Sequence, residues 1–319
     1  MDLRLYCGSA DPELGKSVAA KLRTPLAKRK LQRFPDGEVH VRLEETLRGD
    51  DVFILQSTSP PVDQHLMELL VMVDACRRAA AARVTAIIPY FGYSRQEKKS
   101  AGREPITTRL VADLLTCSGV DRVVSVDLHA PAIQGFFNIE MDHLTAVQLL
   151  IEHLQRHRGE DRVVVSPDTG RVKMAERYAH GLGLPLVVLH KERAETGRVE
   201  VHKVIGDVRG LRPIVIDDMI TTGGTIDEAV RALLEAGARP EITVAATHGL
   251  LVGKAMDRLA NPAIAEVVVT DTVPIPPEKR VKKLLVLSVA ELLAEATRRL
   301  HDERSISALF SPRYNHHPV

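Results

Sequence analysis

The residues with the clearest chemical meaning lie in the segment PIVIDDMITTGGTIDE, residues 213–228. Its β-branched run 214–216 is typical of a strand buried on both faces of a parallel sheet. Two carboxylates, Asp217 and Asp218, follow that run and are expected to stand at the end of the strand. A glycine-rich turn then leads into a helix pattern from Ile226 onward. This order of strand, turn and helix predicts a phosphate-binding site.

The turn between the acid pair and the helix consists of Thr221, Thr222, Gly223, Gly224 and Thr225. Such a turn gathers backbone N–H groups at the positive end of a helix, which favours an anion. Asp217 and Asp218 would repel that anion, so we expect them to hold ribose hydroxyls or a divalent metal. Thr225 and Glu228 have capping-box spacing, which predicts Thr225 as the N-cap. The predicted ligand is a ribose phosphate, and an ordinary βα turn is the alternative.

Polar residues also follow two other apolar runs. His129 comes after the run 123–126, and Asp168 comes after the run 163–165. Both are candidates to share one Mg²⁺ held mainly by substrate phosphates, while a simply hydrogen-bonded histidine is the alternative. Arg171 stands in the same loop as Asp168, where a tight anion loop would prefer glycine.

Two cationic loops complete the candidate chemistry. The loop 90–107, which contains Arg95 and Gln96, follows a strand pattern where open α/β sheets bind ligands. The segment 189–197 contains Lys191 and Arg193, which suit the charge on a transferring phosphoryl group. A solvated charge run and a charged hairpin are the respective alternatives.

The turn RFPDGE carries an aromatic ring and two carboxylates, which could hold a purine and its exocyclic amine. The three residues are Phe34, Asp36 and Glu38. A plain hairpin explains the same pattern. The segment 10–17 ends in Gly-Lys-Ser but lacks the first glycine of a P-loop, so we expect Asp11 and Pro12 simply to start a helix.

Apolar strand patterns alternate with amphipathic helix patterns along the chain, which predicts an α/β fold with mainly parallel sheets flanked by helices. The expected strands are 3–7, 52–55, 84–88, 123–126, 163–165, 186–189, 214–216, 242–246, 267–270 and 284–287. The expected helices are 64–82, 105–115, 144–156, 172–180 and 226–236. The series predicts an N-terminal domain at 1–145, a C-terminal domain at 146–300, and a tail at 301–319 that packs back on the body.

The amino-acid composition limits the kinds of molecule that are expected to bind this protein. The 319 residues carry a net charge of +1 with 45% hydrophobic and 27% charged residues, so neither nucleic acid nor membrane is an expected partner. The three cysteines, Cys7, Cys76 and Cys117, are widely spaced in apolar surroundings and are expected to be reduced core thiols. A cytoplasmic location is the prediction.

The motifs together resemble the ribose-phosphate pyrophosphokinase family over residues 5–310. The matching stretches, in family order, are RFPDGE, PYFGYSRQEKKSAGREPIT, DLHAPAIQGFF, SPDTG, KER, GDVRG, IDDMITTGGT and SISALF. The resemblance implies two phosphoribosyltransferase-type domains and a Mg²⁺-dependent enzyme. Its implied reaction transfers the diphosphoryl group of ATP to O1 of ribose 5-phosphate, giving phosphoribosyl pyrophosphate and AMP.

The resemblance also implies roles for the residues already singled out. ATP would be bound by Phe34, Asp36 and Glu38 from a neighbouring subunit and by Arg95, Gln96 and His129. His129 and Asp168 would contact the metal, and Lys191 and Arg193 would act from a mobile catalytic loop. Ribose 5-phosphate would be bound by Asp217, Asp218, Thr221, Thr222, Gly223, Gly224 and Thr225. A homo-oligomer, often a hexamer, is implied as well.

The residues that would regulate the enzyme match the family pattern less closely than the substrate-binding residues do. Arg48, Ser305, Ser307 and Phe310 match a phosphate or ADP effector site of the regulated members. Thr221 stands where that class usually has Asp, and Thr169, Arg171 and Asn138 also depart from the family pattern. The open alternatives are a phosphoribosyltransferase that consumes the product and a catalytically silent regulatory subunit.

Overall fold

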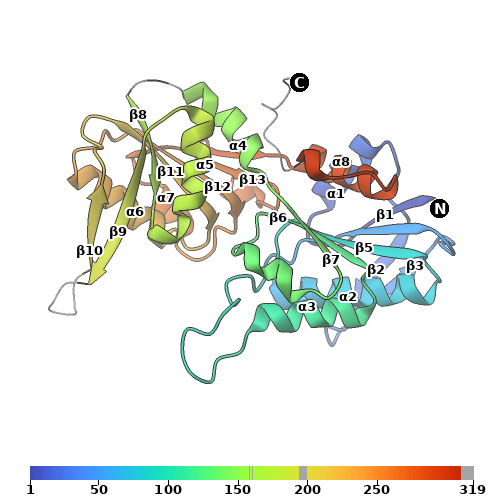
Figure 1. The fold of residues 1–319 in the computed structure, drawn as a ribbon. Helices are drawn as coiled ribbons and strands as arrows, with labels where there is room; N and C mark the ends of the chain where they lie inside the picture. Colours follow the sequence, from blue (N-terminus) through green and yellow to red (C-terminus); the bar gives the residue numbers. More distant parts are fainter. Residues whose placement is uncertain (158, 160, 194–199, 310–319) are drawn as a thin grey trace. The chain divides into compact units, whose positions relative to one another are not determined.

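The computed structural model describes residues 1–309 except 158, 160 and 194–199 (Figure 1). These residues divide into two compact units. Unit 1 contains Met1–Thr145, Thr272–Pro274 and the described residues from Ser288 onward. Unit 2 contains Ala146–Asp271 and Ile275–Leu287. Each unit is an α/β structure built on a sheet that is wholly or mainly parallel, which confirms the predicted fold class.

Unit 1 is organised around a five-stranded sheet with the order β1-β4-β5-β6-β7, in which every neighbouring pair is parallel. Its strands are β1 (Leu3–Cys7), β4 (Asp51–Leu55), β5 (Arg83–Ile88), β6 (Arg122–Val126) and β7 (Glu140–Leu144). The carboxyl ends of all these strands therefore meet at one edge, the edge at which open α/β sheets bind ligands.

Helices cover the sheet of unit 1. These are α1 (Pro12–Leu22), α2 (Val62–Arg78), α3 (Thr107–Ser118) and α8 (Ala290–His301). Helices α2 and α3 lie side by side, and their buried residues, such as Leu69, Val73 and Leu115, pack with Val52 and Val84 of the sheet (Figure 1). Helices α1 and α8 pack against each other.

Two features of unit 1 follow local sequence rules. Asp11 caps α1 by accepting a hydrogen bond from the Leu14 N–H at 2.9 Å, with Pro12 in the first turn, so the segment starts a helix as predicted. The alternating residues after the RFPDGE turn form strand β3 (Val39–Leu43), which pairs antiparallel with β2 (Arg29–Arg33). The RFPDGE turn is thus the tip of a β-hairpin.

Unit 2 contains a seven-stranded sheet with the order β10-β9-β8-β11-β12-β13-β14. Its strands are β8 (Arg162–Ser166), β9 (Leu186–Arg193), β10 (Glu200–Ile205), β11 (Arg212–Ile220), β12 (Ile242–Gly249), β13 (Ile264–Thr270) and β14 (Leu284–Leu287). All neighbouring pairs are parallel except β9 with β10. From β8 the chain runs outward through β9 and β10 and then returns to β11 on the other side, so β8 and β11 flank a topological switch point.

The two faces of this sheet have separate cores. Ile214 and Ile216 of β11 pack with α4 (Val147–Leu154) and α5 (Val172–Leu182). Val215 lies between them and packs on the opposite face with α6 (Gly224–Glu235) and α7 (Ala255–Leu259). This alternation is what a strand buried on both faces requires, and it explains the continuous β-branched run. The short 3-10 helices are Pro131–Phe136, Gln155–His157, Thr169–Arg171, Pro277–Lys279 and Ser307–Leu309.

All ten expected strands and all five expected helices are present, with boundaries shifted by a few residues. Strand β11 is longer than expected, and Asp217 and Asp218 lie inside it rather than at its end. Strand β7 was not predicted, because its sequence EMDHL is polar and mostly half-buried. No helix in the described ranges is long and apolar enough to cross a membrane.

The C-terminal helix, α8, belongs to unit 1, although its position in the sequence indicated the C-terminal domain. The sequence placed residues 290–300 in the C-terminal domain, but the structure groups α8 with unit 1. Arg83 of β5 donates a 3.0 Å hydrogen bond to the Leu300 carbonyl, and His301 Nδ1 lies 2.9 Å from Asp51 Oδ2 of β4. These contacts tie the end of α8 to the sheet of unit 1.

Candidate functional site

Three neighbouring parallel strands of unit 2, β9, β8 and β11, bring most of the candidate residues to one edge of the sheet. Asp168 and Arg171 follow β8, and the acid pair lies in the last part of β11. Lys191 and Arg193 lie in the last part of β9. Because carboxyl ends of parallel strands meet at one edge, the fold gathers acids, cations and the glycine-rich turn around the switch point.

The acid pair is buried and faces an arginine. Asp217 is 8% exposed and Asp218 is 4% exposed. Arg171 Nε lies 3.4 Å from Asp217 Oδ1, and Arg171 Nη2 lies 3.1 Å from Asp218 Oδ1. The Asp218 N–H donates to Asp217 Oδ1 at 2.8 Å. One guanidinium therefore spans both carboxylates, an arrangement for which its planar fork is well suited.

The two carboxylates influence each other. Burial raises the pKa of Asp217 well above its usual range, and the neighbouring Asp218 charge raises it further. Arg171 acts in the opposite direction and lowers the Asp217 pKa. The ionised pair is therefore poorly solvated by the protein alone, and a cation or hydrogen-bond donors from a ligand would stabilise it.

The glycine-rich turn leads directly into α6. Gly223 is the residue before the helix and has φ of +73°, a left-handed conformation that favours glycine. The prediction of Thr225 as N-cap is wrong, because Gly223 turns the chain early and places Thr225 in the first helical turn. The N–H groups of that first turn have no acceptor within the helix and remain suited to an anion. Arg258 of α7 supports the turn by donating to the Thr222 carbonyl at 2.8 Å.

Asp168 is held in place by its own loop. Its Oδ1 accepts the Arg171 N–H at 3.0 Å, and its carbonyl accepts the Ser166 hydroxyl at 2.7 Å. Among the described residues, no three His, Cys, Asp or Glu side chains converge as a metal-binding group. Mg²⁺ commonly takes one or two carboxylates and completes its shell with substrate phosphates and water. A single carboxylate such as that of Asp168 fits that style of binding.

The segment predicted to form a cationic loop begins as a strand. Lys191 and Arg193 lie in β9, in register with His202 and Glu200 of β10. Residues 186–188 of β9 pair with β8, so the strand continues beyond the end of β8 as a two-stranded hairpin. Figure 1 shows this hairpin projecting from the sheet. The backbone thus carries both cations past the edge where the acid pair lies.

The candidate nucleotide loops of unit 1 follow β5 and β6. Arg95 and Gln96 are exposed, and Gln96 Oε1 accepts the Thr107 hydroxyl at 2.6 Å. His129 is half-buried in the loop after β6. Tyr93 and Asp127, in the same two loops, have φ of +63° and +40°. Positive φ at residues other than glycine is strained and concentrates at functional sites.

The tip of the β2–β3 hairpin presents Phe34, Asp36 and Glu38 to solvent, with Phe34 45% exposed. Within the tip, the Phe34 N–H donates to the Glu38 carbonyl at 2.9 Å, and the Phe34 ring lies 5.5 Å from the His40 ring. An aromatic ring left this exposed on an ordered turn is available for stacking against a ligand base.

Arg33, at the base of that tip, anchors it to α2. Its Nη1 donates to the Gly37 carbonyl at 3.2 Å and its Nη2 to the Gln64 carbonyl at 3.3 Å. Its Nη2 also lies 3.6 Å from Glu68 Oε2. The guanidinium therefore ties the hairpin tip to the helix beneath it.

Glu68 is fully buried in α2. Its Oε1 accepts hydrogen bonds from the Ser9 N–H at 2.6 Å and from Gln56 Nε2 at 2.8 Å. Its Oε2 accepts from the Ser9 hydroxyl at 2.7 Å. Glu68 therefore joins the hairpin to the loops that follow β1 and β4, at the carboxyl edge of the unit 1 sheet.

The predicted effector residues are only partly gathered. Ser305 and Ser307 line a cavity of about 500 Å³ with Arg83, Arg122 and Arg304, among others. The Ser305 hydroxyl donates to the Ser307 hydroxyl at 2.9 Å. Arg48 is exposed and does not line this cavity, and Phe310 lies outside the described residues.

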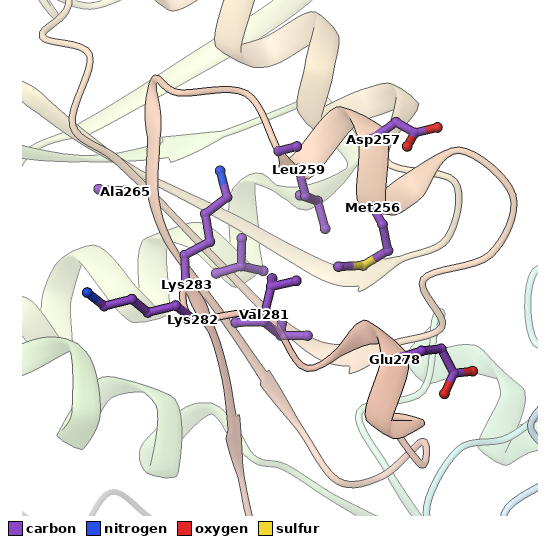
Figure 2. A pocket seen from close by; sticks show the side chains of 11 residues that line it. Met256, Asp257, Leu259, Ala265, Glu278, Val281, Lys282 and Lys283 are labelled. Carbon is purple, nitrogen blue, oxygen red and sulfur yellow. The ribbon is translucent and has the colours of Figure 1, made fainter.

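A larger hollow, about 600 Å³, lies in unit 2 and is lined in part by α7 (Figure 2). Its lining is mainly apolar, with Met256, Leu259 and Val281 pointing into it, whereas Asp257 and Glu278 point away. It contains none of the predicted site residues. Size alone therefore does not identify the reactive site in this protein.

The cysteines follow the prediction in part. Cys7 and Cys76 are buried free thiols, and burial raises the pKa of each to about 12. Cys117 is exposed on α3, so its prediction as a core thiol is wrong. Leu110 and Leu114, seven and three residues before Cys117, lie on the same face of α3 and are exposed as well, so apolar neighbours in sequence did not indicate burial here.

Sequence reasoning missed two residues at these sites. It treated Arg171 only as a departure from a glycine, although Arg171 is the partner of the acid pair. It did not consider Glu68. A signal for Glu68 was present, because an acidic residue among the apolar positions of HLMELLVMV faces the core and needs partners there.

Comparison with known proteins gives two matches to family models. Residues 3–119 match the N-terminal domain of ribose phosphate pyrophosphokinase. Residues 199–311 match the phosphoribosyl synthetase-associated domain. The two matches together span most of the chain.

Individual relatives match almost the whole chain. The "Ribose-phosphate pyrophosphokinase" of Caldanaerobacter subterraneus subsp. tengcongensis is 48% identical over 310 residues, covering 97% of this chain and 98% of that protein. The protein of the same name from Bacillus subtilis is 45% identical over 310 residues, with the same coverage of 97% and 98%. A crystal structure of phosphoribosylpyrophosphate synthetase from Mycobacterium smegmatis matches with a TM-score of 0.89 and 48% identity, covering 95% of this chain and 100% of that one.

Proposed function

This chain belongs to the ribose-phosphate pyrophosphokinase family, and we propose how its residues carry out the reaction of that family. The enzyme transfers the diphosphoryl group of ATP to O1 of ribose 5-phosphate. A bond forms between O1 and the β-phosphorus while the O1 hydroxyl loses its proton to solvent, the bond between the α,β-bridging oxygen and the β-phosphorus breaks, and AMP leaves with the bridging oxygen. Such transfers need accurate positioning and charge compensation more than covalent chemistry from the protein.

The observation that carries the proposal is the arrangement of β9, β8 and β11 as neighbours, which brings the acid pair and the glycine-rich turn to the edge of unit 2 from which the β9–β10 hairpin extends. The turn 221–225 and the start of α6 hold the 5-phosphate, and Asp217 and Asp218 accept hydrogen bonds from the ribose hydroxyls. Lys191 and Arg193 act on the transferring diphosphoryl group from the β9–β10 hairpin. Asp168, after β8, contacts the metal that accompanies that group.

Unit 1 supplies the nucleotide side in this proposal. Arg95, Gln96 and His129 bind ATP from the loops after β5 and β6. Phe34, Asp36 and Glu38 bind the adenine of a neighbouring subunit, which the exposure of the hairpin tip supports. The protein is accordingly proposed to be a homo-oligomer, with a hexamer as the expected form. Its substrates are ATP and ribose 5-phosphate.

The metal is a divalent cation, and we propose Mg²⁺. Bound to the phosphates of ATP, it would neutralise charge and polarise the β-phosphoryl group. The carboxylate of Asp168 is an oxygen ligand that fits a hard cation, and His129 is retained as a candidate contact. A cytoplasmic location is also a proposal, supported by the buried free thiols of Cys7 and Cys76.

An effector site is proposed at the C-terminal segment. The cavity beside Ser305 and Ser307 contains arginines and hydroxyls, which suit phosphate or ADP. Arg48 and Phe310 are retained from the family pattern. Because Thr221 departs from the regulated members, both activation by phosphate and inhibition by ADP need a direct test.

One assay tests the proposed function. The protein is incubated with Mg²⁺, ATP and ribose 5-phosphate, with and without phosphate and ADP, and AMP and phosphoribosyl pyrophosphate are quantified. Formation of both products at equal rates is the expected result. Absence of both products would refute the assignment, whereas release of pyrophosphate that depends on an added purine or pyrimidine base would identify a phosphoribosyltransferase. A protein active only in mixture with another synthase would be a regulatory subunit.

The Arg33–Glu68 contact gives a more local prediction. Glu68→Gln keeps an acceptor for the Ser9 N–H but removes the negative charge opposite Arg33. We expect the KM for ATP to rise about tenfold, because a lost charge-assisted contact costs about 1.5 kcal/mol. We expect kcat and the KM for ribose 5-phosphate to change little. Steady-state kinetics with each substrate varied in turn is the measurement.

Lys30→Gln is the matched control for that prediction. Lys30 belongs to the stem of the same hairpin and lies 3.6 Å from Glu44, with its side chain 64% exposed. It changes the charge of the hairpin without touching the tip, so both KM values should stay as in the unmodified protein. A Glu68→Gln enzyme with an unchanged KM for ATP would show that the contact does not position the adenine-binding tip.

A further inference from the structure

Arg171 occupies a position from which it can act on the acid pair before any ligand arrives. It ends the short helix Thr169–Arg171 that follows β8, and β8 is the direct neighbour of β11 in the sheet. Its N–H is fixed by Asp168 Oδ1 at 3.0 Å, so its backbone is anchored independently of its side chain. Its side chain, 18% exposed, points to the two carboxylates of β11.

Arg171 offsets part of the negative charge of the acid pair. Asp217 and Asp218 are adjacent residues, and their side chains are 11% and 5% exposed, so water cannot screen their repulsion well. Two adjacent ionised carboxylates in such a place require a nearby positive charge. Arg171 supplies one charge to both, through contacts of 3.4 Å and 3.1 Å.

We propose that Arg171 is the resident counter-ion of the Asp217–Asp218 pair, and that its guanidinium fills the role a divalent cation would otherwise play while the ribose site is empty. The pair then keeps its arrangement without bound metal. A divalent cation added alone meets a fixed positive charge at these carboxylates and binds them weakly. Arg171 is therefore a positioning residue that sets how strongly the ribose site depends on metal.

This inference rests on the proposed function only where it assigns the acid pair to ribose 5-phosphate. The proposed effect of Arg171 on metal binding involves only the protein and a metal ion, so it can be tested without any substrate. Failure of ribose 5-phosphate to bind the unmodified protein in a calorimetric titration would count against the proposed function. That result would not affect the metal titration, which tests the role of Arg171 independently.

The experiment is a titration of the full chain with MgCl₂, followed by thermal unfolding, with NaCl at matched ionic strength as the salt control. Arg171→Gln keeps a side chain of similar length and leaves the backbone contact to Asp168 intact. We expect it to lower the Mg²⁺ concentration for a half-maximal rise in Tm by at least about tenfold, because one positive charge at this distance changes ionic equilibria by one or more orders of magnitude. The unmodified protein should respond weakly.

Three further variants make the result specific. Arg171→Lys keeps the charge and should respond like the unmodified protein. Arg177→Ala removes one exposed positive charge from α5 and should also leave the response unchanged. Adding Asp217→Asn to Arg171→Gln should abolish the gained response, which places the metal at the acid pair. An Arg171→Gln protein that responds like the unmodified one, or a double variant that keeps the gain, would overturn the proposal.

Discussion

Replacing Lys191 by alanine is expected to lower kcat by about two to three orders of magnitude, the range found when one charged stabiliser of a transition state is removed. The KM values for ATP and ribose 5-phosphate should change little. Negative charge on the transferring group shifts as the bond to AMP breaks, so a cation placed there contributes more in the transition state than in the ground state. A fall in kcat with constant KM is the kinetic sign of that difference.

Lys203→Ala is the matched control, since Lys203 belongs to β10 of the same hairpin and is exposed. It removes the same charge from the same hairpin and should leave kcat unchanged. Steady-state kinetics under saturating Mg²⁺ measures both variants, and single-turnover experiments separate chemistry from product release. If Lys191→Ala kept the original kcat, or changed only KM, Lys191 would have no role in transition-state stabilisation.

The strands that carry the site could be predicted because they are buried on both faces. Runs such as residues 163–165 and 214–216 have the β-branched composition that such strands need. The two glycines of the turn 221–225 indicate a tight connection between strand and helix. The edge rule for parallel sheets then predicts that the residues after the strands gather together. The sequence alone, however, indicated Asp168, Lys191 and the acid pair as separate motifs, and only the family resemblance assigned them to one site.

The order of strands could not be predicted, and the partner of Arg171 depends on it. β8 and β11 are neighbours only because the chain places β9 and β10 on the far side of β8. Local sequence does not determine this strand order. For that reason Arg171 was interpreted from the sequence only as a residue that departs from the glycine expected in an anion-binding loop. The apolar pattern of α2 could have indicated the burial of Glu68, but not its partners, because Ser9 and Gln56 come from two separate loops.

The hydrophobic periodicity of the last helix could not predict which of the two units the helix packs against. The pattern of α8 shows that one face is apolar, but it does not show which sheet that face covers. Proximity in sequence favoured the C-terminal half. The deciding groups are polar: Asp51 and Arg83, at the starts of β4 and β5, receive the end of α8 through His301 and the Leu300 carbonyl.

That polar junction gives the prediction with the largest expected effect on stability. Asp51 is fully buried, and it accepts from Arg83 Nε at 2.8 Å and from Arg83 Nη2 at 2.5 Å. The hydrogen bond to Asp51 raises the pKa of Arg83, so the guanidinium stays charged. We expect Asp51→Ala to destabilise the protein by about 3 kcal/mol, the lower part of the range for breaking a buried ion pair, because Arg83 keeps a quarter of its side chain exposed.

Calorimetry gives the size of this effect, and hydrogen exchange gives its location. Since Asp51 also contacts His301, amides of α8 should exchange faster in Asp51→Ala, while those of α5 and α6 in unit 2 should not. Asp74→Ala is the control, because it removes an exposed helical ion pair with Arg78 that contributes well under 1 kcal/mol. If Asp51→Ala lowered the Tm but left exchange in α8 unchanged, the junction would stabilise the sheet without holding the helix. The cavity at Ser305 and Ser307 would then depend on other contacts for its shape.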